Sequence, residues 1–123
     1  MIYNEKYQIK FYKNSANGEN PVLAYLEKQD LKTRNKINKY INFLSEHSGY
    51  LDEPYSKHIK GKIRELRVDF FNNHHRIFYF SFFNKKIILL SAFAKQSDKT
   101  PQKEIKKAIV RYLDVINNPQ LYE

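Results

Sequence analysis

The stretch from Ile63 to Ala94 has the sequence IRELRVDFFNNHHRIFYFSFFNKKIILLSAFA, and it decides the fold. It contains three runs rich in aromatic and β-branched residues, at 63–71, 76–83 and 86–94. These residue types favour strands, and the joints Asn72-Asn73 and Asn84-Lys85 suit tight hairpin turns. The stretch therefore predicts three consecutive strands in an antiparallel meander.

The residues before the meander predict a strand and a helical hairpin. Tyr7, Ile9 and Phe11 alternate with more polar residues, which indicates a strand with one packed face. Asn20-Pro21 is typical of a helix N-cap followed by Pro at the first helical position. Two apolar stripes at helical spacing follow: Val22, Leu23 and Leu26, then Leu31, Ile37, Tyr40, Ile41 and Leu44. The two helices are expected to join near Gln29-Asp30.

The remaining segments complete a single α+β domain over residues 1–123. The polar residues 52–62 are expected to connect the second helix to the meander. Thr100-Pro101 repeats the signature of an N-cap followed by Pro and should open a last helix. The apolar stripe of this helix is Ile105, Ala108, Ile109, Tyr112 and Ile116. The expected order is β-α-α-β-β-β-α, an antiparallel meander sheet with helices packed on it.

Composition excludes several functional classes. The 123 residues contain no Cys, which removes disulfides, a thiolate nucleophile and every zinc site that needs Cys. The sequence has no H-E-x-x-H motif, carboxylate cluster or Gly-rich phosphate loop, so no metal or other cofactor is expected. No run approaches 18 apolar residues and no signal-peptide core begins the sequence, so we expect a soluble cytoplasmic protein that does not bind membranes.

Positive charge is concentrated in the second half of the chain. The formal net charge is +9, and residues 54–111 alone carry 14 Lys and Arg against four Asp and Glu, a balance of +10. A basic field on part of a small domain favours a polyanionic partner, because each neutralised phosphate releases counterions. The alternative is a Lys-rich surface that only aids solubility.

Pairing register gathers part of this charge on one face of the meander. If the turns are centred on the two joints, Arg76 lies opposite Asp69 and Phe93, with Arg67 and Lys95 as diagonal neighbours. Because side chains alternate between faces, one face would carry Glu65, Arg67, Asp69, Arg76 and Lys95. A slip of one residue would move part of this set to the other face. The expected result is a basic pocket near the start of the last helix, where Lys99 adds charge.

Such a pocket suits cleavage of RNA by attack of its own 2′-hydroxyl, which needs a base, an acid and cations around the phosphate. Arg67 and Arg76 have the guanidinium fork that matches phosphate oxygens, unless they only pair with Glu65 or Asp69. Glu65 is either the base or the partner that orients Arg67. His75 is either a stacking or proton-transfer group or a turn residue, and alternation places it opposite Arg76.

Short motifs spread from about Tyr7 to Arg111 match a known family. They are NPV at 20–22, EPYSKH at 53–58, ELR at 65–67, RIFY at 76–79, LLSAF at 89–93 and FAKQSDKTP at 93–101. On these motifs the chain resembles the RelE/HigB toxin superfamily, specifically its phage-derived, HigB-like branch. Three residues depart from the family pattern: Gln96 replaces a Lys, His75 replaces a Tyr, and Arg64 replaces an aromatic residue.

The resemblance implies the toxin component of a type II toxin–antitoxin system with a RelE-like fold. Such a toxin is a metal-independent mRNA endoribonuclease that acts in the A site of the ribosome and inhibits translation. The implied partner is a cognate helix-turn-helix antitoxin (HigA-like), through which alone the toxin would meet operator DNA. The resemblance favours Arg67, Arg76, Lys95 and Lys99 as phosphate and transition-state contacts.

The expected site residues form two sets. The catalytic set is Arg67, Arg76, Lys95 and Glu65, and the RNA-binding set is Lys57, Lys60, Arg64, Lys99 and His75. The alternative function is a non-catalytic RNA- or ribosome-binding module with the same basic sheet. A transcriptional co-regulator that acts only with a partner is a third interpretation. Mapping of mRNA ends after incubation with translating ribosomes separates cleavage from binding.

Overall fold

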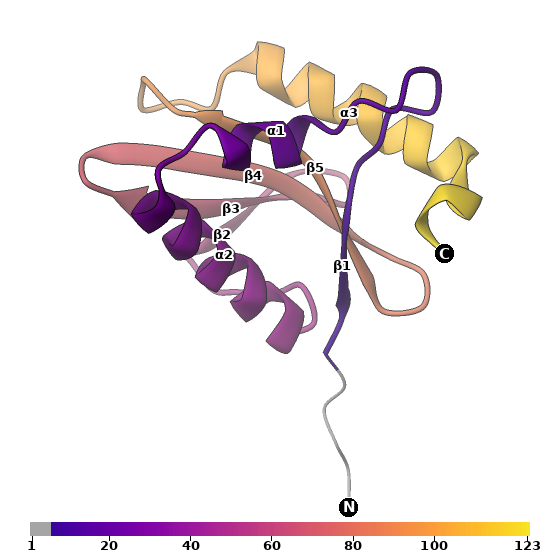
Figure 1. The fold of residues 1–123 in the computed structure, drawn as a ribbon, viewed down its shortest axis with the longest axis horizontal. Coiled ribbons are helices and arrows are strands. Elements are labelled where there is room, and N and C mark those ends of the chain that lie inside the picture. The colour runs from indigo at the N-terminus through magenta and orange to yellow at the C-terminus, as the bar shows by residue number, and fades with distance from the viewer. Residues whose placement is uncertain (1–5) are drawn as a thin grey trace, which may run out of the picture.

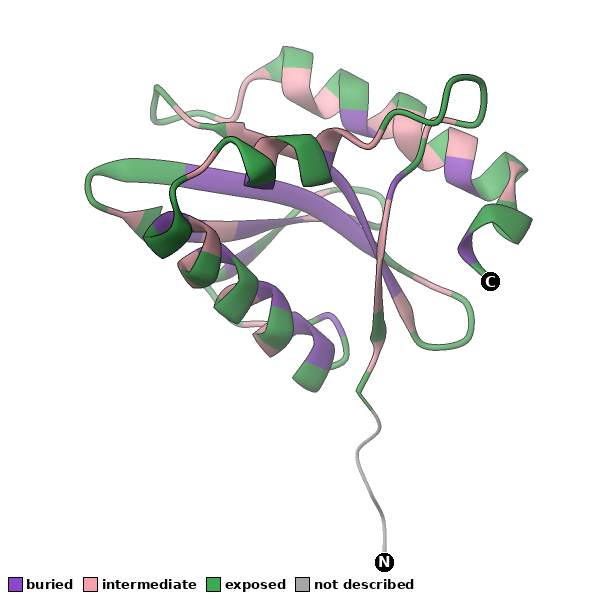
Figure 2. Ribbon diagram, in the orientation of Figure 1, coloured by how far each residue is buried: buried purple, intermediate pink, exposed green. Residues whose placement is uncertain are grey.

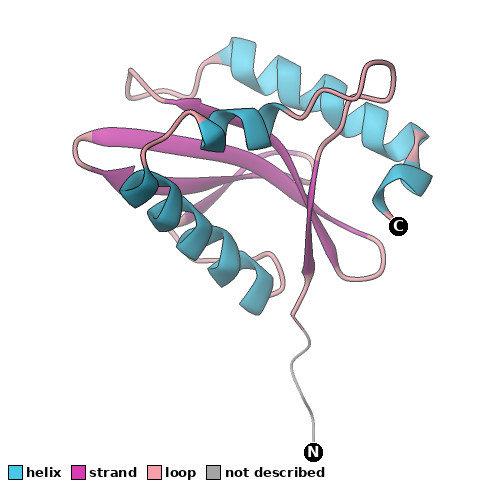
Figure 3. Cartoon of the chain, in the orientation of Figure 1, coloured by secondary structure: helices cyan, strands magenta, loops and turns pink. Residues whose placement is uncertain are grey.

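A five-stranded sheet carries helices on both of its faces in the computed structural model, which describes residues 6–123 (Figure 1). In chain order the elements are β1 (Gln8–Phe11), α1 (Pro21–Glu27), α2 (Leu31–Glu46), β2 (Ser56–Lys60), β3 (Ile63–Phe70), β4 (Asn73–Phe82), β5 (Lys86–Ala94), α3 (Gln102–Asn117) and a 3-10 helix, η1 (Pro119–Tyr122). The strands lie in the order β1-β5-β4-β3-β2. The expected α+β class is confirmed (Figure 3).

The topology differs from the expected one at both edges of the sheet. The segment expected to be a connector contains β2, which pairs antiparallel with β3. This edge strand buries only Ser56 completely, so it lacks the apolar alternation by which a strand is found in sequence. At the other edge, β1 runs parallel to β5, with Ile9 beside Ile87. The expected order was therefore one strand short, while the antiparallel pairing of β3, β4 and β5 is confirmed.

The sheet separates two apolar clusters. The cluster under α1 and α2 contains Val22, Leu26, Ile37, Ile41, Leu44, Leu66, Val68, Ile77, Tyr79, Ile87 and Leu89. The cluster under α3 contains Tyr12, Ile63, Phe78, Phe80, Ile88, Leu90, Ala108, Val115 and Tyr122. The central strand β4 is buried along most of its length, as Figure 2 shows in purple. Among the described helices, none is long and apolar enough to cross a membrane.

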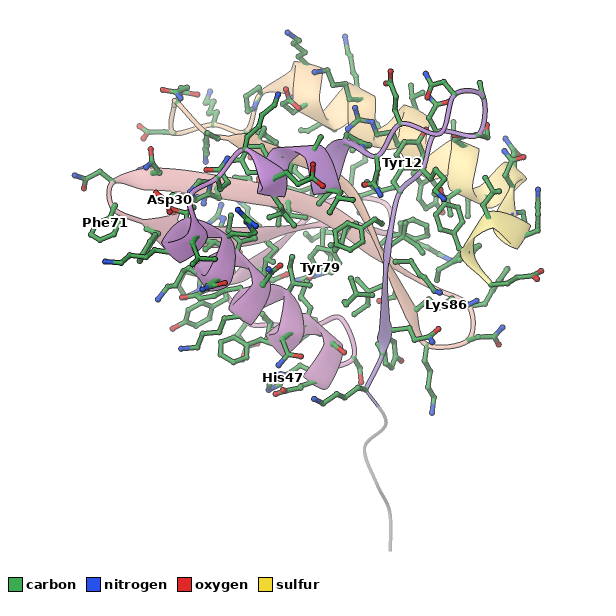
Figure 4. All side chains as sticks on the ribbon, viewed as in Figure 1. Tyr12, Asp30, His47, Phe71, Tyr79 and Lys86 are labelled. Atoms are coloured by element: carbon green, nitrogen blue, oxygen red, sulfur yellow. The ribbon has the colours of Figure 1, made fainter. Side chains whose placement is uncertain are left out.

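The β3–β4 hairpin turns at Phe71 and Asn72, one residue earlier than expected. Both residues have positive φ, 50° and 62°, and Phe71 lies at the exposed tip of the hairpin (Figure 4). Arg76 therefore pairs with Arg67 and not with Asp69, which corrects the expected register. The partner has moved by two residues, so every side chain keeps its expected face.

The β4–β5 hairpin contains a bulge that restores the expected register. Near the turn, Phe82 pairs with Lys86, one residue away from the expected partner. Farther along, Tyr79 pairs with Leu89 but Phe78 pairs with Ser91, so Leu90 is an extra residue in β5. Beyond this bulge Arg76 pairs with Phe93, as expected from the sequence.

The helix ends follow the sequence signals with one exception. The Asn20 side chain accepts a hydrogen bond from the backbone N–H of Leu23 (3.2 Å), so this N-cap is confirmed. Asp30 caps α2 in the same way through Thr33 (2.8 Å). Helix α3 instead starts at Gln102, with no side-chain cap. The hydroxyl of Thr100, the expected N-cap, donates a hydrogen bond to Glu65 instead.

The apolar stripes of the helices are buried in part. In α1, Leu23 is 41% exposed, and in α2 Leu31 is 65% exposed. In α3, Ala108 is buried as expected, whereas Ile116 is 41% exposed and Val115 takes its place in the core. The stripe of α3 is therefore rotated near its C-terminal end.

Gly49 is the glycine on which this fold depends most. Its φ is +82°, its N–H donates to Leu44 O (2.8 Å) at the end of α2, and its carbonyl accepts from the Tyr79 hydroxyl (3.0 Å). An added Cβ would lie 2.5 Å from the Ser81 hydroxyl oxygen. Gly49→Ala should lower the free energy of unfolding by about 2–4 kcal/mol, through left-handed strain and steric overlap together.

Gly18→Ala is the matched control for this prediction. Gly18 also has positive φ, +76°, but a Cβ there would have no neighbour within 4 Å. This substitution should cost only the backbone strain, about 1–2 kcal/mol. Urea denaturation of both variants measures the difference, and equal losses would show that the contact with Ser81 is unimportant.

Candidate nucleic-acid interface

A basic groove of about 760 Å³ lies between the edge of the sheet and the loop that leads into α3. Its lining consists of Lys57, His58, Ile59, Arg67, Lys95, Ser97, Asp98, Lys99, Thr100, Pro101, Gln102 and Ile105. Four of these side chains are cations, against the single carboxylate of Asp98. The excess of positive charge in the groove suits phosphate groups.

Glu65 lies beneath this groove and joins two of its walls. The side chain is fully buried on β3. One carboxylate oxygen accepts a hydrogen bond from Arg67 Nε (3.0 Å), and the other accepts from the Thr100 hydroxyl (3.0 Å). Glu65 therefore orients Arg67 and ties the loop before α3 to the sheet. In this position Glu65 exposes no surface from which it could take a proton from RNA.

Arg76 lies behind Arg67, and its side chain is 7% exposed. Its Nη1 donates to Asp69 (2.8 Å) and to the carbonyl of His75 (3.0 Å), and its Nε lies 4.0 Å from Glu65. Arg67 on β3 and Arg76 on β4 are directly paired in the sheet. Two like charges in such a pair repel each other. The carboxylates of Glu65 and Asp69 offset this repulsion.

Asp69 connects this ion-pair network to solvent. Its carboxylate accepts hydrogen bonds from Arg76 and from His74 Nδ1 (2.9 Å). Partial burial acts to raise the pKa of Asp69, but the hydrogen bonds and positive charges of Arg76 and His74 outweigh it. The pKa of the Asp69 carboxyl therefore lies below its ordinary value, which keeps the partner of Arg76 charged.

His75 lies on the opposite face of the sheet from Arg76, and the structure does not bring it to the groove. It is 2% exposed, and its Nδ1 is 2.6 Å from the hydroxyl of Tyr25 in α1. Burial, followed by the charge of Arg76, lowers the pKa of His75. Burial also raises the pKa of Tyr25, to about 12, so this hydroxyl keeps its proton. The pair fastens α1 to β4.

Two further expected contacts also lie outside the groove. The Nε of Arg64 donates to the Ser56 hydroxyl (3.1 Å), and its guanidinium lies 4.7 Å from the centre of the Tyr50 ring. Lys60 is exposed at the end of β2 but does not line the groove. The structure thus brings together Lys57, Arg67, Lys95 and Lys99, with Glu65 beneath them.

The structure adds two side chains that the sequence reasoning missed, His58 and Asp98. His58 was not expected in the site because its strand, β2, was predicted to be a connector. Its Nε2 lies 2.8 Å from the Gly61 carbonyl, which only accepts, so Nε2 carries a proton and donates it to this carbonyl. Asp98 lies within the FAKQSDKTP motif, which was the signal that could have identified it. Across residues 6–123, no group of three or more His, Asp or Glu could hold a metal ion.

The residues that line this groove all lie between Lys57 and Ile105, and the buried carboxylate of Glu65 lies within the same range. The chain matches the model of the family of phage-derived Gp49-like proteins (DUF891) over residues 24–113, well over half of its length. It therefore belongs to this family, which is part of the RelE/ParE-like toxin–antitoxin superfamily. The resemblance to the toxin superfamily is confirmed at this level, and the HigB-like branch stays a prediction. No curated protein matches the chain.

The burial of His75 predicts a dependence of stability on pH. Its unfolded pKa is about 6.5 and its folded pKa is lower, so between these values the unfolded chain binds more protons. The free energy of unfolding should therefore fall as pH is lowered from 7.5 to 5.5. Urea denaturation at both pH values should show this fall in the wild type and a smaller one in His75→Gln.

His47→Gln provides the control, because His47 is an exposed histidine at the end of α2. This variant measures how far replacing an exposed histidine by glutamine changes the pH dependence of unfolding. Other titrating groups are common to all three proteins and cancel in the comparison. Equal slopes for the wild type and His75→Gln would contradict a neutral, buried His75.

Proposed function

We propose that this protein is the toxin of a toxin–antitoxin pair and that it inhibits translation by cleaving mRNA in the A site of the ribosome. The observation that carries the proposal is the groove in which Arg67, Lys95 and Lys99 meet above the buried Glu65. Membership of the Gp49-like family, which is associated with toxin ribonuclease activity in general, supports it. The proposed substrate is single-stranded RNA, whose backbone phosphates fit a row of cations.

The proposed reaction is a transesterification that needs no metal. The 2′-oxygen of one nucleotide attacks the adjacent phosphorus, and the bond from phosphorus to the 5′-oxygen breaks. The products are a 2′,3′-cyclic phosphate and a 5′-hydroxyl end. One proton leaves the 2′-hydroxyl for a base, and an acid returns one to the 5′-oxygen.

Each groove residue has a role in this scheme. Arg67, Lys95 and Lys99 stabilise the negative charge that accumulates on the phosphorane, and Lys57 binds a neighbouring phosphate. Asp98 and His58 supply the proton acceptor and donor, since they are the groove's side chains with a carboxylate and an imidazole. Glu65 and Arg76, first expected to be catalytic, become positioning residues. Glu65 orients Arg67, and Arg76 supports the pair from behind together with Asp69.

The proposed partner is a helix-turn-helix antitoxin, and the family membership supports a partner of this kind. An antitoxin silences the toxin either by covering the groove or by excluding the complex from the ribosome. The positive groove favours an acidic segment on such a partner, because complementary charge speeds association and rejects wrong partners.

Arg67 separates a catalytic role from a structural one. Purified protein added to translating ribosomes should create new mRNA ends, mapped by primer extension. Arg67→Ala should slow this cleavage about 10²–10³-fold, because it removes a charge-assisted contact to the transition state. Arg67→Lys keeps the charge but loses the bidentate fork, and should recover only part of the rate. Unchanged cleavage in Arg67→Ala would refute the placement of the substrate in this groove.

Two controls accompany this experiment. Lys39→Ala, on the side of the sheet that α2 covers, should leave cleavage unchanged. Arg76→Ala should mainly lower the unfolding midpoint, because it leaves Glu65 and Asp69 with fewer partners. Circular dichroism melting of each variant separates a loss of rate from a loss of fold.

The second candidate function is a non-catalytic RNA- or ribosome-binding module. The observation that favours it is the burial of Glu65 and Arg76 in ion pairs, because two of the four side chains expected to be catalytic have little or no exposed surface. The same ribosome assay decides between the two functions. Inhibited translation with intact mRNA at a large excess of protein would establish the binding module and overturn cleavage.

A further inference from the structure

A second basic hollow, of about 590 Å³, lies on the other side of α3 from the groove. It is lined by Tyr12, Asn14, Lys103, Lys106, Lys107, Val110 and Arg111. Figure 4 places Tyr12 at the start of the loop between β1 and α1, and this loop runs beside α3 in Figure 1. Gln102 and Ile105 of the same helix line the groove. The first turns of α3 therefore separate the two sites.

Arg111 is held rigidly at the floor of this hollow. Its Nη1 donates to the carbonyl of Leu90 (3.2 Å) and to the hydroxyl of Ser91 (2.7 Å). Its guanidinium carbon lies 5.8 Å from the centre of the Tyr12 ring. Both hydrogen bonds use Nη1, and the side chain lines the hollow. A guanidinium fixed in this way loses little conformational entropy when it binds a phosphate.

The positive charge of the hollow is largely uncompensated. In the part of the chain that the structure describes, no ion pair involves Arg111, Lys103 or Lys106. Lys107 lies 3.5 Å from Glu104, whose side chain is 18% exposed, so the charge of this one lysine is partly compensated. Lys103 and Lys107 are one helical turn apart, a rise of about 6 Å. The hollow thus presents several cations at a spacing that suits successive phosphates.

We propose that an RNA strand bound in the groove continues across the N-terminal turns of α3 into this hollow, so that the protein holds its substrate at two places. This inference rests on the proposed function. The hollow binds the sugar–phosphate backbone that flanks the cleaved bond, and it reads no base. Single-stranded RNA is favoured over an acidic protein segment because residues from the same turns of α3 line both basic sites. A strand of successive phosphates satisfies both sites at once.

The test compares a short and a long RNA. A labelled trinucleotide fills the groove alone, and a labelled dodecanucleotide also reaches the hollow; a 2′-deoxy sugar at the cleavage position keeps both intact. Affinity is measured by fluorescence anisotropy at several salt concentrations. Each lost phosphate contact should reduce the slope of log K against log salt by about 0.7 for single strands. Lys103→Ala/Lys106→Ala should therefore reduce the slope by about 1.4 for the long RNA and leave the short RNA unchanged.

A matched variant controls for the loss of two charges. Lys32→Ala/Lys39→Ala removes the same charge from α2, on the opposite face of the sheet, and should leave both slopes close to the wild type. An equal slope for the long RNA in the wild type and in Lys103→Ala/Lys106→Ala would overturn the proposal. If that variant binds the long RNA normally but loses affinity for the antitoxin, the hollow is a protein-docking site.

The outcome is distinguishable from failure of the proposed function. If the protein cleaves no mRNA but the slope for the long RNA falls as stated, the hollow stands as an RNA-binding site on a non-catalytic module. If cleavage occurs and the slope does not change, the groove alone binds the substrate and the inference fails.

Discussion

The buried carboxylate of Glu65 is the interaction on which the site depends. A buried carboxylate is costly unless its oxygens accept hydrogen bonds, and here a guanidinium donates to one oxygen of Glu65 and a hydroxyl donates to the other. One partner belongs to the sheet and the other to the loop before α3. The same group thus fixes the floor of the groove and one of its walls. Arg67 and Arg76 can face each other only because Glu65 and Asp69 lie between and beside them.

Much of this arrangement follows from local sequence rules. The three central strands, the cap at Asn20 and the shared face of the charged residues were all predictable, since alternation holds as long as the register moves by an even number of residues. The bulge at Leu90 corrects the odd shift at the second turn. Edge strand β2 was not predictable, because a strand that contacts one neighbour and buries one serine carries no apolar pattern.

Local sequence rules also did not predict how far each charged side chain is buried. Arg67 lines the groove and Arg76 does not. The loop that forms one wall of this groove is fixed by a hydrogen bond between Thr100 and Glu65, which are 35 positions apart. Phe71 in a left-handed turn is another such case, because its local preference disfavours the conformation that the sheet imposes. The sequence therefore predicts the members of the charged cluster better than their exposure.

The bulge at Leu90 also links the hairpin to the last helix. A bulge leaves one residue outside the regular ladder, and Arg111 of α3 binds the carbonyl of this residue and the hydroxyl of the next. A hairpin closed in a slipped register would present other groups at that position, and α3 would lose this anchor. The bulge that sets the pairing of β4 with β5 thus also provides the groups to which α3 is anchored.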